Sequence, residues 1–198
     1  MNKNFKVLNK DPFIREYSNF LDIDTCKKII EDFGEELKPS MTTDGKKHIL
    51  HDGRISKSCF IDSQEKIIEP IVQKLIKNIE TDKYFFFNPQ LTLYEIGGKY
   101  IAHSDAFDLR DYKISKEIKS KGQRAITNII YLNNVLEGGE TSFPLLQIKV
   151  PPEAGKLVSF NNCMNGTLDM HPMSIHESLP VIKGKKFILT FWAHTNDR

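Results

Sequence analysis

The chain opens with a short strand-like segment, followed by apolar residues that recur at helical spacing. Residues 12–17 have strand character. In residues 25–37 the apolar side chains lie three or four positions apart, and Asp22 or Asp24 can cap the start of a helix. The polar residues 38–53 that come next are typical of a loop or an irregular hairpin.

A second helical pattern covers residues 64–79. Its apolar positions form one stripe, and Ser63 can cap the amino-terminal end. Pro70 lies inside this pattern, so it either kinks the helix or moves its start to a later residue. Both predicted helices have one apolar face, which is expected to pack on a sheet.

After Thr81 the pattern changes to short runs rich in β-branched and aromatic residues. These runs are residues 90–96, 125–132, 156–160 and 186–193. Glycine and proline turns separate them, and few helical patterns intervene. Many short strands joined in this way predict an antiparallel sandwich or barrel. The charged residues 110–121 interrupt the series and are expected to form a loop or a short exposed helix.

Composition narrows the class of protein. The 198 residues fit one domain, and 28 basic residues against 26 acidic ones predict no broad nucleic-acid surface. No apolar run approaches the roughly 18 residues that a membrane-spanning helix needs, and the first residues lack the apolar core of a signal peptide. Three scattered cysteines favour reduced thiols. We therefore expect a cytoplasmic protein that does not bind membranes; its oligomeric state stays open.

Candidate chemistry begins with His103 and Asp105, which are two positions apart. Alternate residues of a strand point to the same side, so the imidazole and the carboxylate can converge on one ion. Residue type alone does not choose a third ligand. The five other histidines are His48, His51, His171, His176 and His194.

His176 stands out among these histidines because Lys186 follows it by ten positions, at the start of a predicted strand. His171 has no lysine at that offset. Two imidazoles and one carboxylate leave half of an octahedron open, as in non-haem Fe(II) oxygenases that bind a chelating co-substrate and O2. A co-substrate with two carboxylates needs a cation for its far end, which a lysine in an apolar barrel supplies. Tyr94 can add a phenolic hydrogen bond.

Four segments carry a resemblance to a known family. They are DPFIREYSNFLDIDTCKKIIEDF, YEIGGKYIAHSDAF, GQRAITNIIYLNNVLEGGETSFP and HESLPVIKGKKFILTFWAH. Together they resemble the catalytic domain of the prolyl 4-hydroxylase branch of the 2-oxoglutarate- and Fe(II)-dependent dioxygenases, from about residue 12 to residue 194. The resemblance implies a mainly β fold with flanking helices, a double-stranded β-helix (jelly roll, cupin-like). Residues 1–198 would form one domain, with helical support in residues 18–80 and the β core in residues 84–195.

The resemblance also implies roles for particular residues. Iron is assigned to His103, Asp105 and His176. The residues assigned to 2-oxoglutarate are Lys186, Tyr94 and Trp192. The residues expected to face or border the peptide substrate are Arg124, His194, Arg54 and Ser56, with Thr127 lining the pocket.

The activity implied by the resemblance is hydroxylation of an unactivated C–H bond, at C4 of peptidyl-proline, with succinate and CO2 as co-products. Fe(II), 2-oxoglutarate and O2 would be required, and a dependence on ascorbate is implied. The partner would be a proline-containing peptide or protein. Two alternatives stay open: the same chemistry on another residue or a small molecule, and a non-catalytic β-sandwich binding module.

Overall fold

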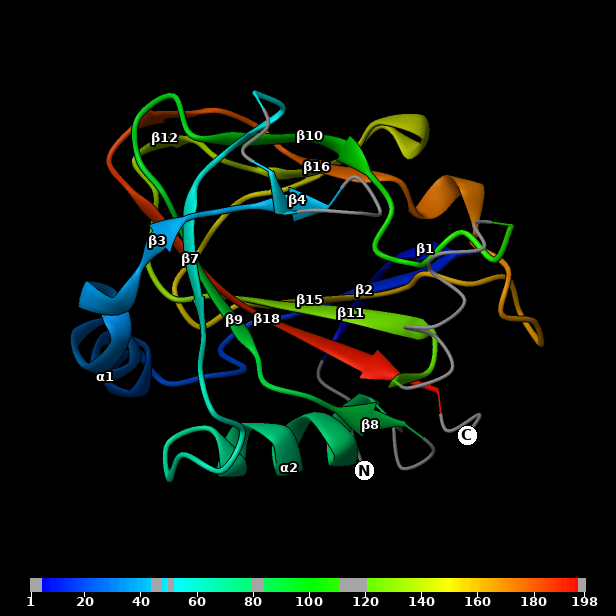
Figure 1. The fold of residues 1–198 in the computed structure, drawn as a ribbon, viewed down its shortest axis with the longest axis horizontal. Coiled ribbons are helices and arrows are strands. Elements are labelled where there is room, and N and C mark those ends of the chain that lie inside the picture. The colour runs from blue at the N-terminus through cyan, green and yellow to red at the C-terminus, as the bar shows by residue number, and fades with distance from the viewer. Residues whose placement is uncertain (1–4, 44–47, 50–51, 80–83, 111–120, 196–198) are drawn as a thin grey trace.

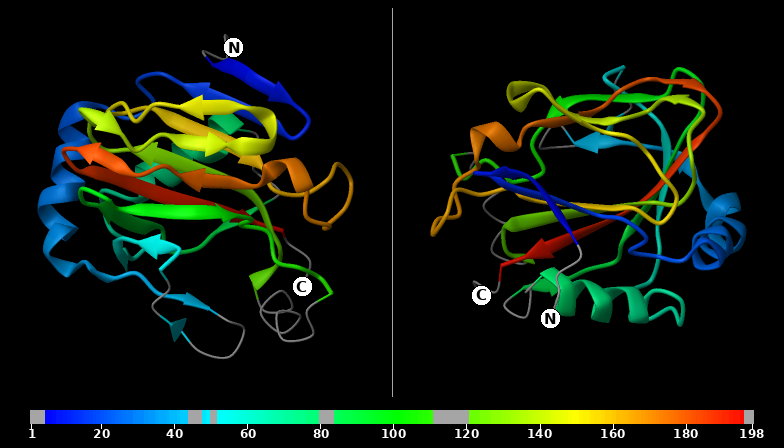
Figure 2. Two further views of the ribbon diagram at one scale, coloured as in Figure 1. Left: turned by 90° about the horizontal axis from the view of Figure 1, so that it is seen from above. Right: turned by 180° about the vertical axis from the view of Figure 1, so that it is seen from behind.

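The computed structural model describes residues 5–43, 48–49, 52–79, 84–110 and 121–195. Its strands form two antiparallel sheets that face each other, with helices on the outer side of the larger one (Figures 1 and 2). This arrangement confirms the predicted mainly β jelly-roll fold. No helix in these ranges has the length and apolar character needed to cross a bilayer.

The larger sheet has nine strands within the described ranges, in the order β1-β2-β15-β11-β18-β9-β7-β3, and β8 pairs with β18. Their bounds are β1 Lys6–Lys10, β2 Phe13–Tyr17, β3 Lys38–Pro39, β7 Lys57–Phe60, β8 Phe85–Phe86, β9 Gln90–Tyr94, β11 Arg124–Tyr131, β15 Leu157–Asn161 and β18 Lys186–His194. Its inner strands β9, β11, β15 and β18 match the four runs predicted after Thr81.

The smaller sheet has the order β14-β13-β16-β10-β6, and two short pairs, β12-β17 and β4-β5, complete the strands. The bounds in the sheet are β6 Arg54–Ile55, β10 Lys99–His103, β13 Thr141–Phe143, β14 Ile148–Val150 and β16 His176–Ser178. The short pairs are β4 Thr42–Thr43, β5 His48–Ile49, β12 Glu137–Gly138 and β17 Val181–Lys183. Pairing of β4 with β5 agrees with the irregular hairpin expected in residues 38–53. Most of the charged segment 110–121 lies outside the described residues.

Helix α1 (Ile23–Phe33) begins two residues before the predicted range 25–37 and ends earlier than expected. The Asp22 carboxylate accepts a hydrogen bond from the Thr25 backbone N–H at 2.8 Å, which identifies Asp22 as the N-cap. The predicted end at residue 37 is wrong, because Gly34–Glu36 form a 3-10 turn. Glycine is a poor helix former, and acidic side chains are unfavourable at the carboxyl end of a helix.

Helix α2 (Glu69–Ile79) begins five residues after the predicted start at residue 64. The predicted start and the predicted cap Ser63 are therefore wrong. Residues 63–68 form turns and a bend instead. Proline in a helix interior removes a hydrogen bond and clashes with the preceding turn, whereas it is tolerated in the first turn. Pro70 therefore sets the later start, which is the second of the two outcomes expected from its position.

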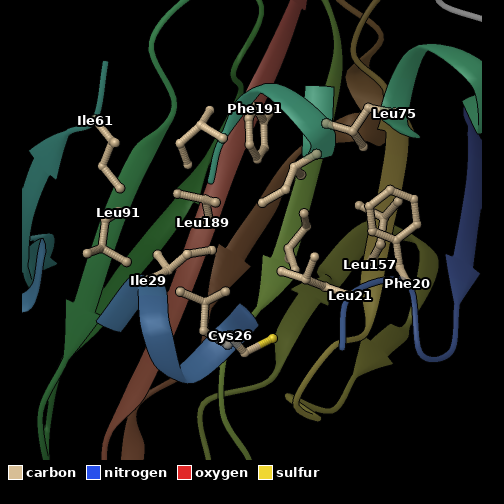
Figure 3. Packing of buried hydrophobic residues seen from close by; sticks show 14 of the residues in the cluster. Phe20, Leu21, Cys26, Ile29, Ile61, Leu75, Leu91, Leu157, Leu189 and Phe191 are labelled. Carbon is tan, nitrogen blue, oxygen red and sulfur yellow. The ribbon is translucent and has the colours of Figure 1, made fainter. Parts of the chain in front are cut away.

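The two larger apolar cores of the described residues lie on opposite faces of the larger sheet. The outer core packs α1 and α2 against β9, β15 and β18, with Cys26, Ile29, Leu75, Leu189 and Phe191 among its buried side chains (Figure 3). The inner core fills part of the space between the two sheets. Its members include Tyr94, Ile129, Tyr131, Phe143 and Phe160. The rest of that space is the site described next.

Within the described residues, two further 3-10 turns are Pro144–Leu146 and Pro172–Ser174. The second one precedes β16 and leads the chain into the space between the sheets. Ser174 within it is fully buried, and its hydroxyl donates to the backbone carbonyl of His171 at 2.7 Å. This turn therefore fixes the start of β16, where His176 lies.

Candidate active site

Strand pairing brings His103 and His176 together. They lie directly opposite each other in β10 and β16, and their ring centroids are 4.4 Å apart. The Asp105 carboxylate joins them, with Oδ1 at 3.6 Å from His103 Nε2 and Oδ2 at 3.7 Å from His176 Nε2. One ligand atom from each of the three residues lies within 4.8 Å of the others. The structure thus assembles the three residues that the sequence selects as metal ligands. We call His103, Asp105 and His176 the ligand group.

Asp105 does not lie on the same strand as His103, although the spacing of the two residues predicted this. β10 ends at His103, so Asp105 lies in the bend that comes after it and not on the same strand. Its carboxylate Oδ2 accepts hydrogen bonds from the Thr127 hydroxyl at 2.7 Å and from the Trp192 indole N–H at 2.9 Å. Contacts from the opposite sheet, and not strand alternation alone, therefore place the carboxylate.

The protonation states suit a divalent metal. His103 Nδ1 lies 2.8 Å from the Ile101 carbonyl oxygen, and His176 Nδ1 lies 3.1 Å from that of Ser174. Because a carbonyl only accepts, each Nδ1 carries the proton and each Nε2 keeps its lone pair. Burial lowers the pKa of His176 to about 4, so this ring is neutral at physiological pH.

Asp105 supplies the negative charge of this group. Burial acts to raise the pKa of its carboxyl, but the His176 and His103 rings in their protonated forms, together with the Arg124 guanidinium, outweigh that effect and hold the pKa well below its usual range. Two imidazoles and one carboxylate are the donors that non-haem iron uses. The residues present therefore fit Fe(II).

Lys186, the first residue of β18, lies deeper between the sheets. Its side chain is buried, with 1% of its surface exposed, whereas the neighbouring Lys183 and Lys185 are exposed. Its Nζ lies 4.4 Å from the centre of the Tyr94 ring, in the residue directly opposite on β9. The ammonium group donates to the Gly139 carbonyl at 2.8 Å and to the Ser178 hydroxyl. One of its three N–H groups therefore remains for a ligand.

Burial shifts the pKa values of Lys186 and Tyr94 in opposite directions. It lowers the pKa of Lys186 to about 7, against the raising effect of Glu140. It raises the pKa of Tyr94 to about 12, so the phenol stays protonated and can donate a hydrogen bond. A cation and a hydroxyl donor in an apolar setting suit one carboxylate of a small ligand. Both residues line the same cavity of about 800 Å³ as the three ligand residues.

Arg54 crosses the mouth of this cavity from the smaller sheet. Its Nη2 donates to the Gln90 side-chain carbonyl at 3.1 Å, and its Nε donates to the Ser56 hydroxyl at 3.2 Å. The guanidinium also lies 4.8 Å from the Tyr100 ring centre, and that ring stacks on His103 at 3.7 Å. Arg54 therefore connects the two sheets beside the ligand group, with Ser56 behind it.

Arg124 and His194 line the cavity from the larger sheet, where they lie opposite each other on β11 and β18. The Arg124 guanidinium lies between two aromatic rings, 4.2 Å from Trp192 and 4.9 Å from Phe107. His194 Nδ1 lies 3.2 Å from the Gly122 carbonyl oxygen, which leaves Nε2 as an acceptor. Burial lowers the pKa of His194 to about 4, so the ring is neutral. All these side chains line the cavity.

Several cavity residues were missed from the sequence. Phe60 and Phe87 line the mouth and keep 59% and 39% of their surface exposed. For Phe87 the run of three phenylalanines at residues 85–87 was the available signal, because clustered exposed apolar side chains often mark a binding surface. Of the remaining histidines, His171 pairs with Asp11 at 3.4 Å, and the side chains of His48 and His51 lie outside the described residues.

Comparisons with known proteins agree with this geometry. A model of the 2OG-Fe(II) oxygenase superfamily matches residues 89–194. Probable prolyl 4-hydroxylase 9 of Arabidopsis thaliana is 29% identical over 216 residues, which cover 98% of this chain and 73% of the relative. Prolyl 4-hydroxylase 2 of the same plant is 30% identical over 215 residues, which cover 96% and 70%.

A solved structure is also similar over most of its length. The viral collagen prolyl hydroxylase of Paramecium Bursaria Chlorella virus-1, in its 2OG complex, aligns with a TM-score of 0.72 and 27% identity. The alignment covers 91% of this chain and 94% of the viral protein. The similarity thus includes the sheets that carry the ligand group and the buried lysine.

Proposed function

The chain belongs to the 2OG-Fe(II) oxygenase superfamily, in its prolyl 4-hydroxylase branch, and from this premise we propose that it hydroxylates peptidyl-proline at C4. Fe(II), 2-oxoglutarate and O2 are its cofactor and co-substrates. The observation that carries the proposal is one cavity in which His103, Asp105 and His176 converge above the buried Lys186. A non-catalytic binding module would not need this intact set.

Each part of the set has a role in the reaction. His103, Asp105 and His176 would hold iron through the two Nε2 atoms and a carboxylate oxygen. Bound there, iron would supply, with 2-oxoglutarate and O2, the oxidising power to hydroxylate an unactivated C–H bond, with succinate and CO2 as co-products. Lys186 neutralises the far carboxylate of 2-oxoglutarate, and the Tyr94 hydroxyl donates to it. The apolar inner core around them keeps water away from this end of the co-substrate.

The mouth of the cavity favours a peptide over a small molecule. Exposed aromatic side chains at Phe60 and Phe87 suit proline rings, which pack on aromatic faces in proline-rich recognition. Arg54, Arg124 and the His194 acceptor can bind backbone carbonyls and N–H groups beside the reacting residue. The relatives named prolyl 4-hydroxylase support the choice of proline. Trp192 lies near enough to Asp105 to border the co-substrate as well.

The function is tested by turnover with defined peptides. The purified protein, Fe(II), 2-oxoglutarate and a proline-rich peptide should yield succinate and a peptide that gains one oxygen atom on proline, located by tandem mass spectrometry. Lysine-containing peptides and free proline serve as competing substrates. Succinate formation with oxygen on lysine or on free proline only would overturn the peptidyl-proline assignment. A parallel series with and without ascorbate tests the ascorbate dependence, which remains a prediction.

Phe60→Ala is expected to raise KM for a long proline-rich peptide about fivefold, with little change in kcat. Loss of an exposed aromatic contact costs about 1 kcal/mol, and it lies away from the reacting atoms. Steady-state kinetics with peptides of increasing length measure the effect, and KM for 2-oxoglutarate should not change. Phe85→Ala is the matched control, because Phe85 is 42% exposed but does not line the cavity. Equal effects of both variants would contradict a role for Phe60.

A cytoplasmic location is part of the proposal. The free cysteines Cys26, Cys59 and Cys163 support a reducing compartment. The near balance of 28 basic and 26 acidic residues gives no support for a nucleic-acid partner. Imaging of a fluorescent fusion in the native host tests the location.

A further inference from the structure

We propose that Thr127 and Trp192 are positioning residues that hold Asp105 by one carboxylate oxygen and leave only the other for the metal. This inference rests on the proposed iron site. Thr127 lies on β11 and Trp192 on β18, and both donate to Asp105 Oδ2, at 2.7 Å and 2.9 Å. A carboxylate oxygen accepts about two hydrogen bonds, so Oδ2 has none of its acceptor capacity left. Oδ1 is then the oxygen that remains for coordination.

The direction of these hydrogen bonds is fixed by chemistry. An indole N–H only donates, so Trp192 must donate to the carboxylate. The Thr127 hydroxyl has a single proton, and it accepts a hydrogen bond from Asn162 Nδ2 at 2.8 Å. Its proton is therefore directed to Asp105. Thr127 and Asn162 are both fully buried, which shields this chain of hydrogen bonds from competing water.

The register of the larger sheet places both donors under the ligand group. Thr127 lies directly opposite Trp192 on β18 and directly opposite Phe160 on β15. The Phe160 ring packs 4.7 Å from the His176 ring. One row of the larger sheet therefore contacts two of the three ligands, and His103 and His176 themselves come from the smaller sheet. The packing of one sheet on the other sets the ligand geometry.

The Trp192 ring is itself fixed in place. The Arg124 guanidinium covers one region of the indole at 4.2 Å and also stacks on Phe107 at 4.9 Å. The buried Gln123 side chain holds Phe107, since its carbonyl accepts from the Phe107 N–H at 2.8 Å and its amide donates to the Phe107 carbonyl at 2.9 Å. These contacts keep the indole N–H aimed at Asp105. Because these contacts already restrain the Trp192 side chain, it loses little conformational entropy when it donates to the Asp105 carboxylate.

The test measures metal binding without any substrate. In a Mn(II) titration of the whole protein, Thr127→Val and Trp192→Phe should each weaken binding about 10- to 100-fold, as loss of groups that orient metal ligands generally does. Thr127→Ser keeps the hydroxyl and should stay within about threefold of the wild type. Thr190→Val is the control, since Thr190 is buried on the same face of β18 and makes no hydrogen bond with Asp105 in the described part of the structure.

Two outcomes overturn the proposal. One is Mn(II) affinity within about twofold of the wild type for both Thr127→Val and Trp192→Phe, with circular dichroism melts showing that they are folded. The other is equal weakening by Thr127→Val and Thr127→Ser, which would assign the effect to packing. The visible spectrum of bound Co(II) gives a second readout, because its intensity should change in Thr127→Val and not in Thr127→Ser. If the wild type itself binds no metal, the proposed function fails instead.

Discussion

Replacing His103 by alanine is expected to lower the turnover of 2-oxoglutarate to succinate at least about a thousandfold, the scale of loss seen when a residue of a catalytic set is removed. The substitution removes one of the three groups that meet within 4.8 Å and leaves the Asp105 carboxylate buried with one imidazole. It also removes the ring on which Tyr100 stacks. Succinate release measured under saturating Fe(II) and 2-oxoglutarate tests this expectation.

A matched histidine separates loss of a ligand from loss of a buried ring. His171 is 7% exposed and its Nδ1 accepts from the Met173 N–H at 3.1 Å, but it does not belong to the ligand group. His171→Ala should keep turnover within about threefold, since the packing, the Met173 hydrogen bond and the pairing with Asp11 that it removes all lie outside the three ligand residues. If His103→Ala retains turnover, or if both variants lose it equally, the assignment of His103 to iron is contradicted.

The inner strands of the larger sheet were predictable because both of their faces are buried. β9, β11, β15 and β18 carry long runs of β-branched and aromatic residues, and such runs identify a strand without knowledge of its neighbours. β1 was missed because it lies at the edge of the sheet, where residues such as Lys6 and Lys10 are exposed and the apolar pattern disappears. The start of α2 was uncertain because Pro70 is compatible with two positions.

The ligand group was predictable to the extent that it depends on short spacing. His103 and Asp105 are two residues apart, and Lys186 follows His176 at a fixed offset. By contrast, the contact of Trp192 and Thr127 with Asp105 depends on the register between β11 and β18 and on the distance between two sheets. No local pattern encodes that register. For this reason the sequence linked Trp192 to the co-substrate and did not link it to Asp105.

Burial distinguishes Lys186 from the two nearby lysines, Lys183 and Lys185. All three are equally basic in the sequence, and only the offset from His176 favoured Lys186. In the structure Lys183 and Lys185 are exposed, and Lys186 is enclosed with Tyr94 and Ser178. An ammonium group that is removed from water without a carboxylate partner is costly for a fold. Its retention at this position is therefore evidence for a ligand that supplies the negative charge.

Lys186→Met is expected to weaken 2-oxoglutarate binding at least about a hundredfold while Mn(II) binding stays near wild type, because removal of one partner of a buried charge pair costs several kcal/mol. The substitution keeps the length of the side chain and removes the cation. Isothermal titration of 2-oxoglutarate into the Mn(II)-loaded protein measures the effect. Lys185→Met is the control, since Lys185 is the exposed neighbour.

The same residue should make 2-oxoglutarate binding depend on pH. Burial lowers the pKa of Lys186 to about 7, so above that pH the free protein holds a neutral amine that must gain a proton to bind the carboxylate. Affinity should therefore fall as pH rises from 7 to 9, and titrations in buffers of different ionisation enthalpy should show proton uptake. A pH-independent affinity without proton uptake would contradict a neutral amine in the free protein.

Lys186→Met should also raise the thermal stability of the ligand-free protein, and more at pH 6 than at pH 9. The unfolded chain holds a lysine with an ordinary pKa near 10.5, so between about pH 7 and that value unfolding takes up a proton. Raising the pH through this window therefore favours the folded state, and the destabilisation due to Lys186 is fully present only below pH 7. Methionine has no charge to desolvate, so the gain in Tm should shrink as pH rises. A gain that is equal at both pH values, or a loss at pH 6, would show that the hydrogen bonds of Lys186 to Gly139 and Ser178 outweigh the desolvation of its ammonium group.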